Sequence, residues 1–327
     1  MTSGPTTILP SGLPTFAVNI PQPDLAPYIA GNTGVTGFTC LESNKAGPHV
    51  VLVSLIHGNE YAGAAALATL LASNFKPLCG KLTIGFANLA AFERFDPNNP
   101  TASRYLEEDM NRVWDDFTLF GIRHSLELDR AREIKPIIDS ADILLDLHSM
   151  LWPSEPLFLC STNTHGRQLG LEIGTPALVV ADTGHVSGKR LIDYGHFTEK
   201  SLRPNASLIL EAGLHWQPET IQQCTKTIHA LLKRTCLSTP LEQPTLSRCA
   251  RVIKTITART NRFQFVREFQ GGDLIAKAGT LIAYDGVEEI YTPEDNLVMV
   301  MPSLKVGHGH TAVRLARLTT DPQYPLK

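Results

Sequence analysis

Two histidines and two glutamates of this chain follow short apolar runs, and together they have the residue types of a catalytic metal site. His57 and Glu60 end the segment VVLVSLIHGNE that starts at Val50, His148 follows ILLDL, and Glu211 follows SLIL. Two histidines and one carboxylate with an open fourth position are a common ligand set for catalytic zinc, and a second carboxylate nearby can handle protons. Other divalent ions also bind such a set. The pattern predicts metal-assisted hydrolysis if the fold brings these segments together.

Alternating strand-like and helix-like segments predict a fold that does so. The apolar runs of strand length span residues 50–56, 82–87, 143–147, 177–180 and 207–210, and the segments with helical spacing span 62–73, 126–139 and 218–237. Such alternation is typical of an α/β fold with a mixed, mostly parallel sheet flanked by helices. Ligands bind such sheets in the crevice at the carboxyl ends of the strands. We therefore expect the four candidate residues to project into that crevice.

The character of the sequence changes near residue 240. The stretch LSTPLEQP, residues 237–244, has the composition of a linker. Beyond it, helical spacing disappears, and glycine-containing turns such as GGD at 271–273 separate short alternating stretches. We predict an α/β catalytic domain over residues 1–240 and a smaller C-terminal all-β domain of barrel-sandwich type over residues 241–327. The tail lacks the lysine hairpin of a lipoyl carrier, which favours a structural role.

The overall charge and the cysteines exclude several classes of protein. A net charge of −3 over 327 residues provides no basic field for nucleic acid or for an anionic membrane. The six cysteines are scattered without a C-x-x-C pair, as expected for reduced thiols. The N-terminus lacks the pattern of a secretory signal, and no apolar run reaches the roughly 18–20 residues that span a bilayer. We expect a cytoplasmic protein with a small-molecule partner, and the sequence leaves open whether it forms a homo-oligomer.

A charged segment supplies candidate contacts for an anionic substrate. Arg104 precedes the pair Asn111 and Arg112 in the stretch RYLEEDMNR. A guanidinium matches a carboxylate or a developing oxyanion, and an asparagine adds a directional neutral contact. The same residues taken alone would form a solvated charged loop. Asp146 shares a strand face with His148 and is either an acceptor for that imidazole or a strand carboxylate bonded to backbone.

Four motifs in a fixed order resemble one family of enzymes. They are HGNE at 57–60, RYLEEDMNR at 104–112, DLHS at 146–149 and EAG at 211–213. This order is similar to that of the succinylglutamate desuccinylase and aspartoacylase family, relatives of the zinc carboxypeptidases. The likeness runs from about Val50 to Gly213, and a β-rich tail is also typical of the family.

The resemblance implies a role for each candidate residue and a reaction. The implied roles are zinc ligands at His57, Glu60 and His148, a general base and acid at Glu211, a carbonyl-polarising group at Arg104, and substrate-carboxylate contacts at Asn111 and Arg112. The implied cofactor is one zinc ion per chain. The implied substrate is a small anionic N-acyl amino acid or related amide, from which hydrolysis removes the acyl group.

The sequence departs from aspartoacylase upstream of Glu211, where a further arginine and a tyrosine grip the substrate. The candidates that could replace these contacts are Lys200, Arg203, and Tyr284 or Tyr291 from the tail. The second substrate-carboxylate contact therefore stays open.

Two other functions are compatible with the same fold. The first is a carboxypeptidase that acts on short peptides or cell-wall fragments. We expect the tail domain to narrow the entrance to the site and so to exclude polypeptides, which distinguishes the deacylase from this alternative. The second is a non-catalytic small-molecule binding protein. The presence of ligands, a base and an oxyanion partner argues against this second alternative.

Overall fold

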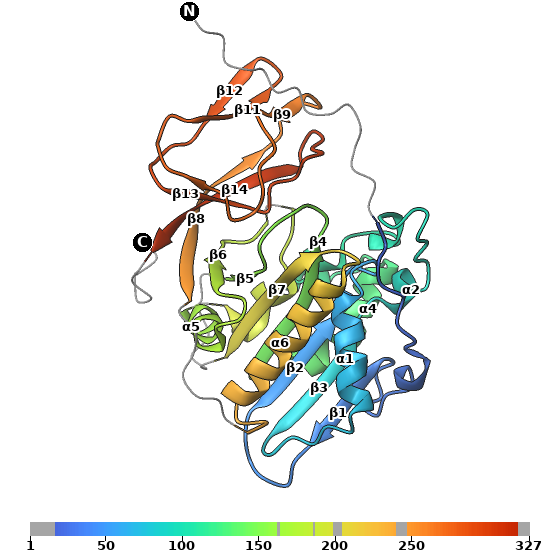
Figure 1. Cartoon of the computed structure of the whole chain (residues 1–327). Coiled ribbons are helices and arrows are strands. Elements are labelled where there is room, and N and C mark those ends of the chain that lie inside the picture. Colours follow the sequence, from blue (N-terminus) through green and yellow to red (C-terminus); the bar gives the residue numbers. More distant parts are fainter. Residues whose placement is uncertain (1–16, 162–163, 186, 199–204, 240–246, 320–327) are drawn as a thin grey trace, which may run out of the picture.

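The computed structural model shows a mixed sheet with helices on both faces (Figure 1). The residues that it describes are 17–161, 164–185, 187–198, 205–239 and 247–319. Within these ranges, no helix is both long and apolar enough to cross a membrane.

One eleven-stranded sheet runs through the described part of the chain. In spatial order its strands are β1 (Phe38–Glu42), β3 (Lys81–Phe86), β2 (His49–Ser54), β4 (Ile143–Met150), β7 (Ala206–Leu214), β5 (Leu157–Cys160), β6 (Leu178–Ala181), β8 (Arg248–Thr257), β14 (Thr311–Thr319), β13 (Leu297–Val300) and β10 (Leu274–Ile275). The neighbours β3, β2, β4 and β7 are parallel, whereas β1 and β5 run antiparallel to β3 and β7. The predicted fold class is confirmed.

The central strands are apolar on both sides because helices cover both faces of the sheet. Val50 and Leu52 of β2 belong to an apolar cluster that includes buried side chains of α1 (Ala62–Ala72), α5 (Thr164–Ile173) and α6 (Pro218–Arg234). Val51 and Val53 alternate with them and pack in a second cluster with α4 (Leu126–Asp139). Two shorter helices, α2 (Leu89–Phe92) and α3 (Asp116–Leu119), lie in the connections between strands. A strand buried on both faces reads as a continuous apolar run, which is why these strands were recognisable.

Two strands are longer than their apolar runs predict. We expected His148 and Glu211 to lie just beyond strand ends, but β4 continues to Met150 and β7 to Leu214. His148 and Glu211 are direct partners in the β4–β7 register. The hydrogen-bonded ladder continues through polar residues because backbone pairing does not require apolar side chains. β5 and α5 were not predicted from the sequence.

The C-terminal strands extend the main sheet. β8 pairs in parallel with β6, and β14, β13 and β10 follow it in antiparallel order. A second sheet contains β12 (Glu288–Tyr291), β11 (Leu281–Asp285) and β9 (Phe263–Phe265). Apolar side chains of both sheets form a separate cluster that includes Phe265, Ile282 and Leu315. The predicted boundary between residues 240 and 241 lies outside the described residues.

Candidate metal centre

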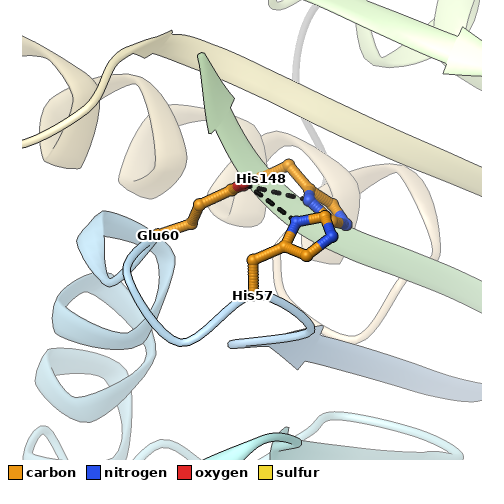
Figure 2. Close-up of side chains that lie close together, drawn as sticks. All are labelled: His57, Glu60 and His148. Atoms are coloured by element: carbon orange, nitrogen blue, oxygen red, sulfur yellow. Dashed lines mark hydrogen bonds and ion pairs between the residues drawn. The ribbon is translucent and has the colours of Figure 1, made fainter. Parts of the chain in front are cut away.

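His57, Glu60 and His148 meet at one point beside the carboxyl ends of β2 and β4 (Figure 2). The loop between β2 and α1 carries His57 and Glu60, and β4 carries His148. One ligand atom of each residue lies within 4.8 Å of the others, and all three side chains are buried. The two carboxylate oxygens of Glu60 face one Nδ1 each, at 2.9 Å from His57 and 3.0 Å from His148. The structure therefore brings these three predicted residues together.

Two aspartates hold the far nitrogens of the imidazoles. His57 Nε2 lies 2.9 Å from Asp109 Oδ1, and His148 Nε2 lies 2.7 Å from Asp146 Oδ2. A carboxylate only accepts hydrogen bonds, so each Nε2 donates to its aspartate, and Nδ1 is the nitrogen of each imidazole that faces Glu60. Asp146 thus contacts the imidazole, as one of the two sequence interpretations predicted. Asp109 was given no role from the sequence, although it lies within the RYLEEDMNR motif.

The electrostatics of this cluster favour a cation. Burial raises the pKa of the Glu60 carboxyl, but the imidazoles of His57 and His148 outweigh burial and hold this pKa well below its usual range. Burial lowers the pKa of His148, but the Asp146 and Glu60 carboxylates outweigh burial and hold this pKa well above its usual value. The buried Nδ1 of His57 has no hydrogen-bond partner. Two imidazole nitrogens and one carboxylate, with further carboxylates around them, fit a divalent metal ion that would take the place of a proton between these groups.

The aspartate that orients His57 should affect metal affinity. We expect Asp109→Asn to lower the affinity for Zn²⁺ by about 10–100-fold, as for other outer partners of metal-binding histidines. Asparagine keeps an oxygen for the Asn111 N–H, which donates to Asp109 Oδ1 at 2.8 Å, so the local turn should survive. Competition with a chromogenic chelator measures the affinity. Asp129→Asn is the matched control because Asp129 also contacts a histidine, His124, but on the exposed surface. Equal affinities for the two variants would contradict the assignment.

The Glu211 side chain lies beside this cluster. It is buried on β7, opposite His148 in register, and its Oε2 has no hydrogen-bond partner. Burial, together with the nearby carboxylates of Glu60 and Asp146, raises the pKa of Glu211 to about 8. A carboxyl group whose pKa lies near neutrality can both accept and return a proton.

Arg104 lies between the cluster and Asp109. It ends a 3₁₀ turn at Ala102–Arg104, and its Nη1 donates to Glu60 Oε1 at 2.7 Å. Its Nη2 lies 3.6 Å from Asp109 Oδ2 and 2.9 Å from His57 Nε2. Because a guanidinium cannot accept a hydrogen bond, an Nε2–H of His57 donates to Asp109 rather than to Arg104. This guanidinium therefore lies beside the three candidate metal ligands.

Asn111 and Arg112 lie on the adjoining 3₁₀ turn, Met110–Arg112. Asn111 Oδ1 accepts a hydrogen bond from the backbone N–H of Leu191 at 2.8 Å, which leaves its amide group as a donor. Arg112 Nη2 lies 3.9 Å from Asp109 Oδ2, so this carboxylate links the turn to His57. The charged segment is thus part of the site rather than a solvated loop.

Other candidates do not join this cluster, and one unassigned residue does. Lys200 and Arg203 lie outside the described residues. Tyr291 donates to the neighbouring Glu289 on the second sheet, and no hydrogen bond links Tyr284 or Tyr291 to the described site residues. His215, which received no role from the sequence, lies 2.7 Å from Ser149 Oγ. The backbone N–H of Ser149 donates to Glu60 Oε2 at 3.0 Å, so His215 contacts a residue that holds the Glu60 carboxylate.

A comparison with protein families decides the identity of the chain. The model for the succinylglutamate desuccinylase/aspartoacylase catalytic domain matches residues 46–235, which is more than half of the chain. The chain belongs to the succinylglutamate desuccinylase/aspartoacylase family. The matched region of this family member contains every residue that received a catalytic, substrate-binding or metal-binding role from the sequence. It also contains Asp109 and Asp146. The family predicted from the order of the four motifs is confirmed.

Solved structures of the family share the fold over most of the chain. The succinylglutamate desuccinylase of Vibrio parahaemolyticus is 18% identical, with a TM-score of 0.66 and 87% of each chain covered. The corresponding protein of Vibrio cholerae is 17% identical, with a TM-score of 0.64 and coverage of 88% of this chain and 89% of its own. The product-bound ectoine utilization protein EutE (DoeB) of Ruegeria pomeroyi is 16% identical, with a TM-score of 0.62 and coverage of 86% and 88%. The family fold thus includes the C-terminal β-rich part.

Proposed function

We propose that the protein is a zinc-dependent deacylase that hydrolyses the amide bond of a small N-acyl amino acid or related amide. The observation that carries this proposal is a buried carboxyl group, that of Glu211, whose Oε2 has no hydrogen-bond partner, beside a buried His–Glu–His cluster. Membership of a family named for desuccinylases and aspartoacylases supports amide hydrolysis. Oε2 of Glu211 is buried without a hydrogen-bond partner, and a catalytic role is one of the recognised reasons for such a group.

His57, Glu60 and His148 would hold one zinc ion per chain. Two imidazoles and one carboxylate with an open position are typical of catalytic zinc sites, and aspartates already orient both imidazoles. When bound, zinc would activate a water molecule and polarise the scissile carbonyl.

Glu211 and Arg104 would handle the charge and the protons of the reaction. Glu211 takes a proton from the attacking water and then delivers it to the leaving amine. The Arg104 guanidinium donates hydrogen bonds to the carbonyl oxygen as negative charge develops there. The contact that Arg104 makes with Glu60 keeps it next to the metal-binding residues before the substrate arrives.

Arg112 and the amide group of Asn111 would bind a carboxylate of the substrate. A guanidinium forms charge-assisted hydrogen bonds with a carboxylate. Asn111 is buried and held through its oxygen, so its amide group has a fixed direction. A small anionic substrate follows from these two donors.

The two arginines should differ in the kinetic parameter they control. We expect Arg112→Ala to raise KM by about 10–100-fold with a smaller change in kcat, because a charge-assisted contact made equally in ground and transition states is lost. Arg104→Ala should instead depress kcat. The assay measures hydrolysis of N-acetyl and N-succinyl amino acids, and Arg123→Ala, at an exposed arginine paired with Glu108, is the control. Small and equal effects at both positions would contradict these roles.

A substrate panel tests the function directly. N-acetyl and N-succinyl derivatives of aspartate, glutamate and neutral amino acids should be cleaved by the zinc-loaded protein, and unmodified dipeptides should not. Preferential cleavage of dipeptides would support the carboxypeptidase alternative. Binding of these compounds without any turnover would support the non-catalytic alternative.

A further inference from the structure

A buried ion-pair network joins the C-terminal strand β14 to the segment that follows β6. Arg314 lies on β14, and its Nε is 3.0 Å from Asp182 Oδ2. The same oxygen accepts a hydrogen bond from Arg190 Nη1 at 3.3 Å. The three side chains are nearly buried, with exposed fractions of 13% for Arg314, 1% for Asp182 and 5% for Arg190. Water therefore cannot easily replace Arg314 as a partner for Asp182.

The network continues from Arg190 to the turn that carries the proposed substrate contacts. Arg190 donates twice to the Asp193 carboxylate, from Nε at 2.7 Å and from Nη2 at 3.0 Å, which fixes the 3₁₀ turn Leu191–Asp193. The backbone N–H of Leu191 donates to Asn111 Oδ1. Asn111 in turn accepts a hydrogen bond from Arg112 Nη1 at its backbone oxygen, at 2.7 Å.

Close packing makes the position of Arg112 depend on this segment. A Cβ atom placed on Gly188 would lie 2.1 Å from the backbone oxygen of Arg112, and Gly188 has a φ of +149°. Lys189 forms a parallel bridge with Val113, and its oxygen accepts the Trp114 N–H at 3.3 Å. Because the two backbones are in contact, a shift of one requires a shift of the other.

We propose that Arg314 is a positioning residue: by holding Asp182 and Arg190, it fixes Asn111 and Arg112 in the geometry that binds the substrate carboxylate. Substrate affinity therefore depends on a residue of the C-terminal β-rich part that acts through Asp182 and Arg190. This inference rests on the proposed function for the role of Arg112, but the mechanical link from Arg314 to Leu191 does not.

Amide hydrogen exchange tests that link without any assay of activity. In Arg314→Gln we expect the Leu191 amide to exchange at least about tenfold faster than in the wild type, because the turn that carries this amide is no longer held against Asn111. Arg317→Gln is the matched control, since Arg317 lies on the same strand but pairs with Glu294, and it should leave Leu191 unchanged. Arg314→Lys keeps the charge and should restore part of the protection. Thermal unfolding verifies that each variant is folded. Unchanged exchange at Leu191 in a folded Arg314→Gln would overturn the proposal.

A double-mutant cycle with Arg112 tests the consequence for the substrate. We expect Arg314→Gln to raise KM for the best substrate of the N-acyl amino acid panel by roughly 3- to 30-fold, with kcat and zinc content nearly unchanged. In the Arg112→Ala background, Arg314→Gln should leave KM almost unchanged, because the substrate contact that Arg314 positions is already absent. An equal rise of KM with and without Arg112, or a decrease of kcat at an unchanged KM, would overturn the positioning role of Arg314. If no panel compound is hydrolysed by the wild type, the proposed function fails, and exchange at Leu191 still decides the link.

Discussion

Replacement of Glu211 by glutamine will lower turnover by about 10²–10⁴-fold and leave the fold and the bound zinc in place. Glutamine has nearly the same shape as glutamate, so it fills the same buried position on β7. Its amide cannot take up a proton, and the proton of the attacking water then has no acceptor. Oε2 of Glu211 makes no hydrogen bond, so the substitution removes the acid–base group without breaking a hydrogen bond of that atom.

The experiment separates loss of the base from loss of the metal. Zinc content by elemental analysis, thermal unfolding and kcat are measured on the same preparations of wild type and Glu211→Gln. Glu133→Gln serves as the control, because Glu133 is exposed and pairs with Arg130 on the same helix, α4. Near-normal turnover in Glu211→Gln would disprove the proposed mechanism. Loss of zinc in this variant would instead identify Glu211 as a ligand.

Removal of the metal-binding histidines will abolish zinc binding and with it the hydrolysis of every substrate. We expect about one zinc ion per chain in the wild type and none in His57→Ala/His148→Ala after dialysis. The loss of affinity should exceed the roughly 10–100-fold effect of an outer aspartate, because a ligand atom itself is missing. Elemental analysis of the dialysed proteins gives the stoichiometry, and the N-acyl amino acid assay gives the activity.

A surface histidine provides the control for this second experiment. His124 is exposed and contacts Asp129, so His124→Ala should retain both zinc and activity. If the wild type contains no zinc and cannot be loaded with zinc, the fold stands and the proposed chemistry fails. If the double variant keeps its zinc, the metal site lies elsewhere in the protein.

The sequence by itself was sufficient to find the central strands and the candidate ligands. Strands such as β2 are buried on both faces, so their apolar character is continuous and visible without a structure. His57, Glu60 and His148 could be selected because each follows such a run, and parallel strands place their carboxyl ends at one edge. The order of the motifs was likewise sufficient for the family.

Only the tertiary structure decided which side chains contact each other across distant segments. The short run of β5 shows no sign in the sequence that it pairs antiparallel with β7. The contact of Asp109 with His57 spans 52 positions, and that of Arg314 with Asp182 joins two separate parts of the chain. Periodicity and composition are local properties of a sequence. Pairing between remote segments depends on how the whole core packs, and for this reason the partners of the catalytic candidates, unlike their identities, had to be seen in three dimensions.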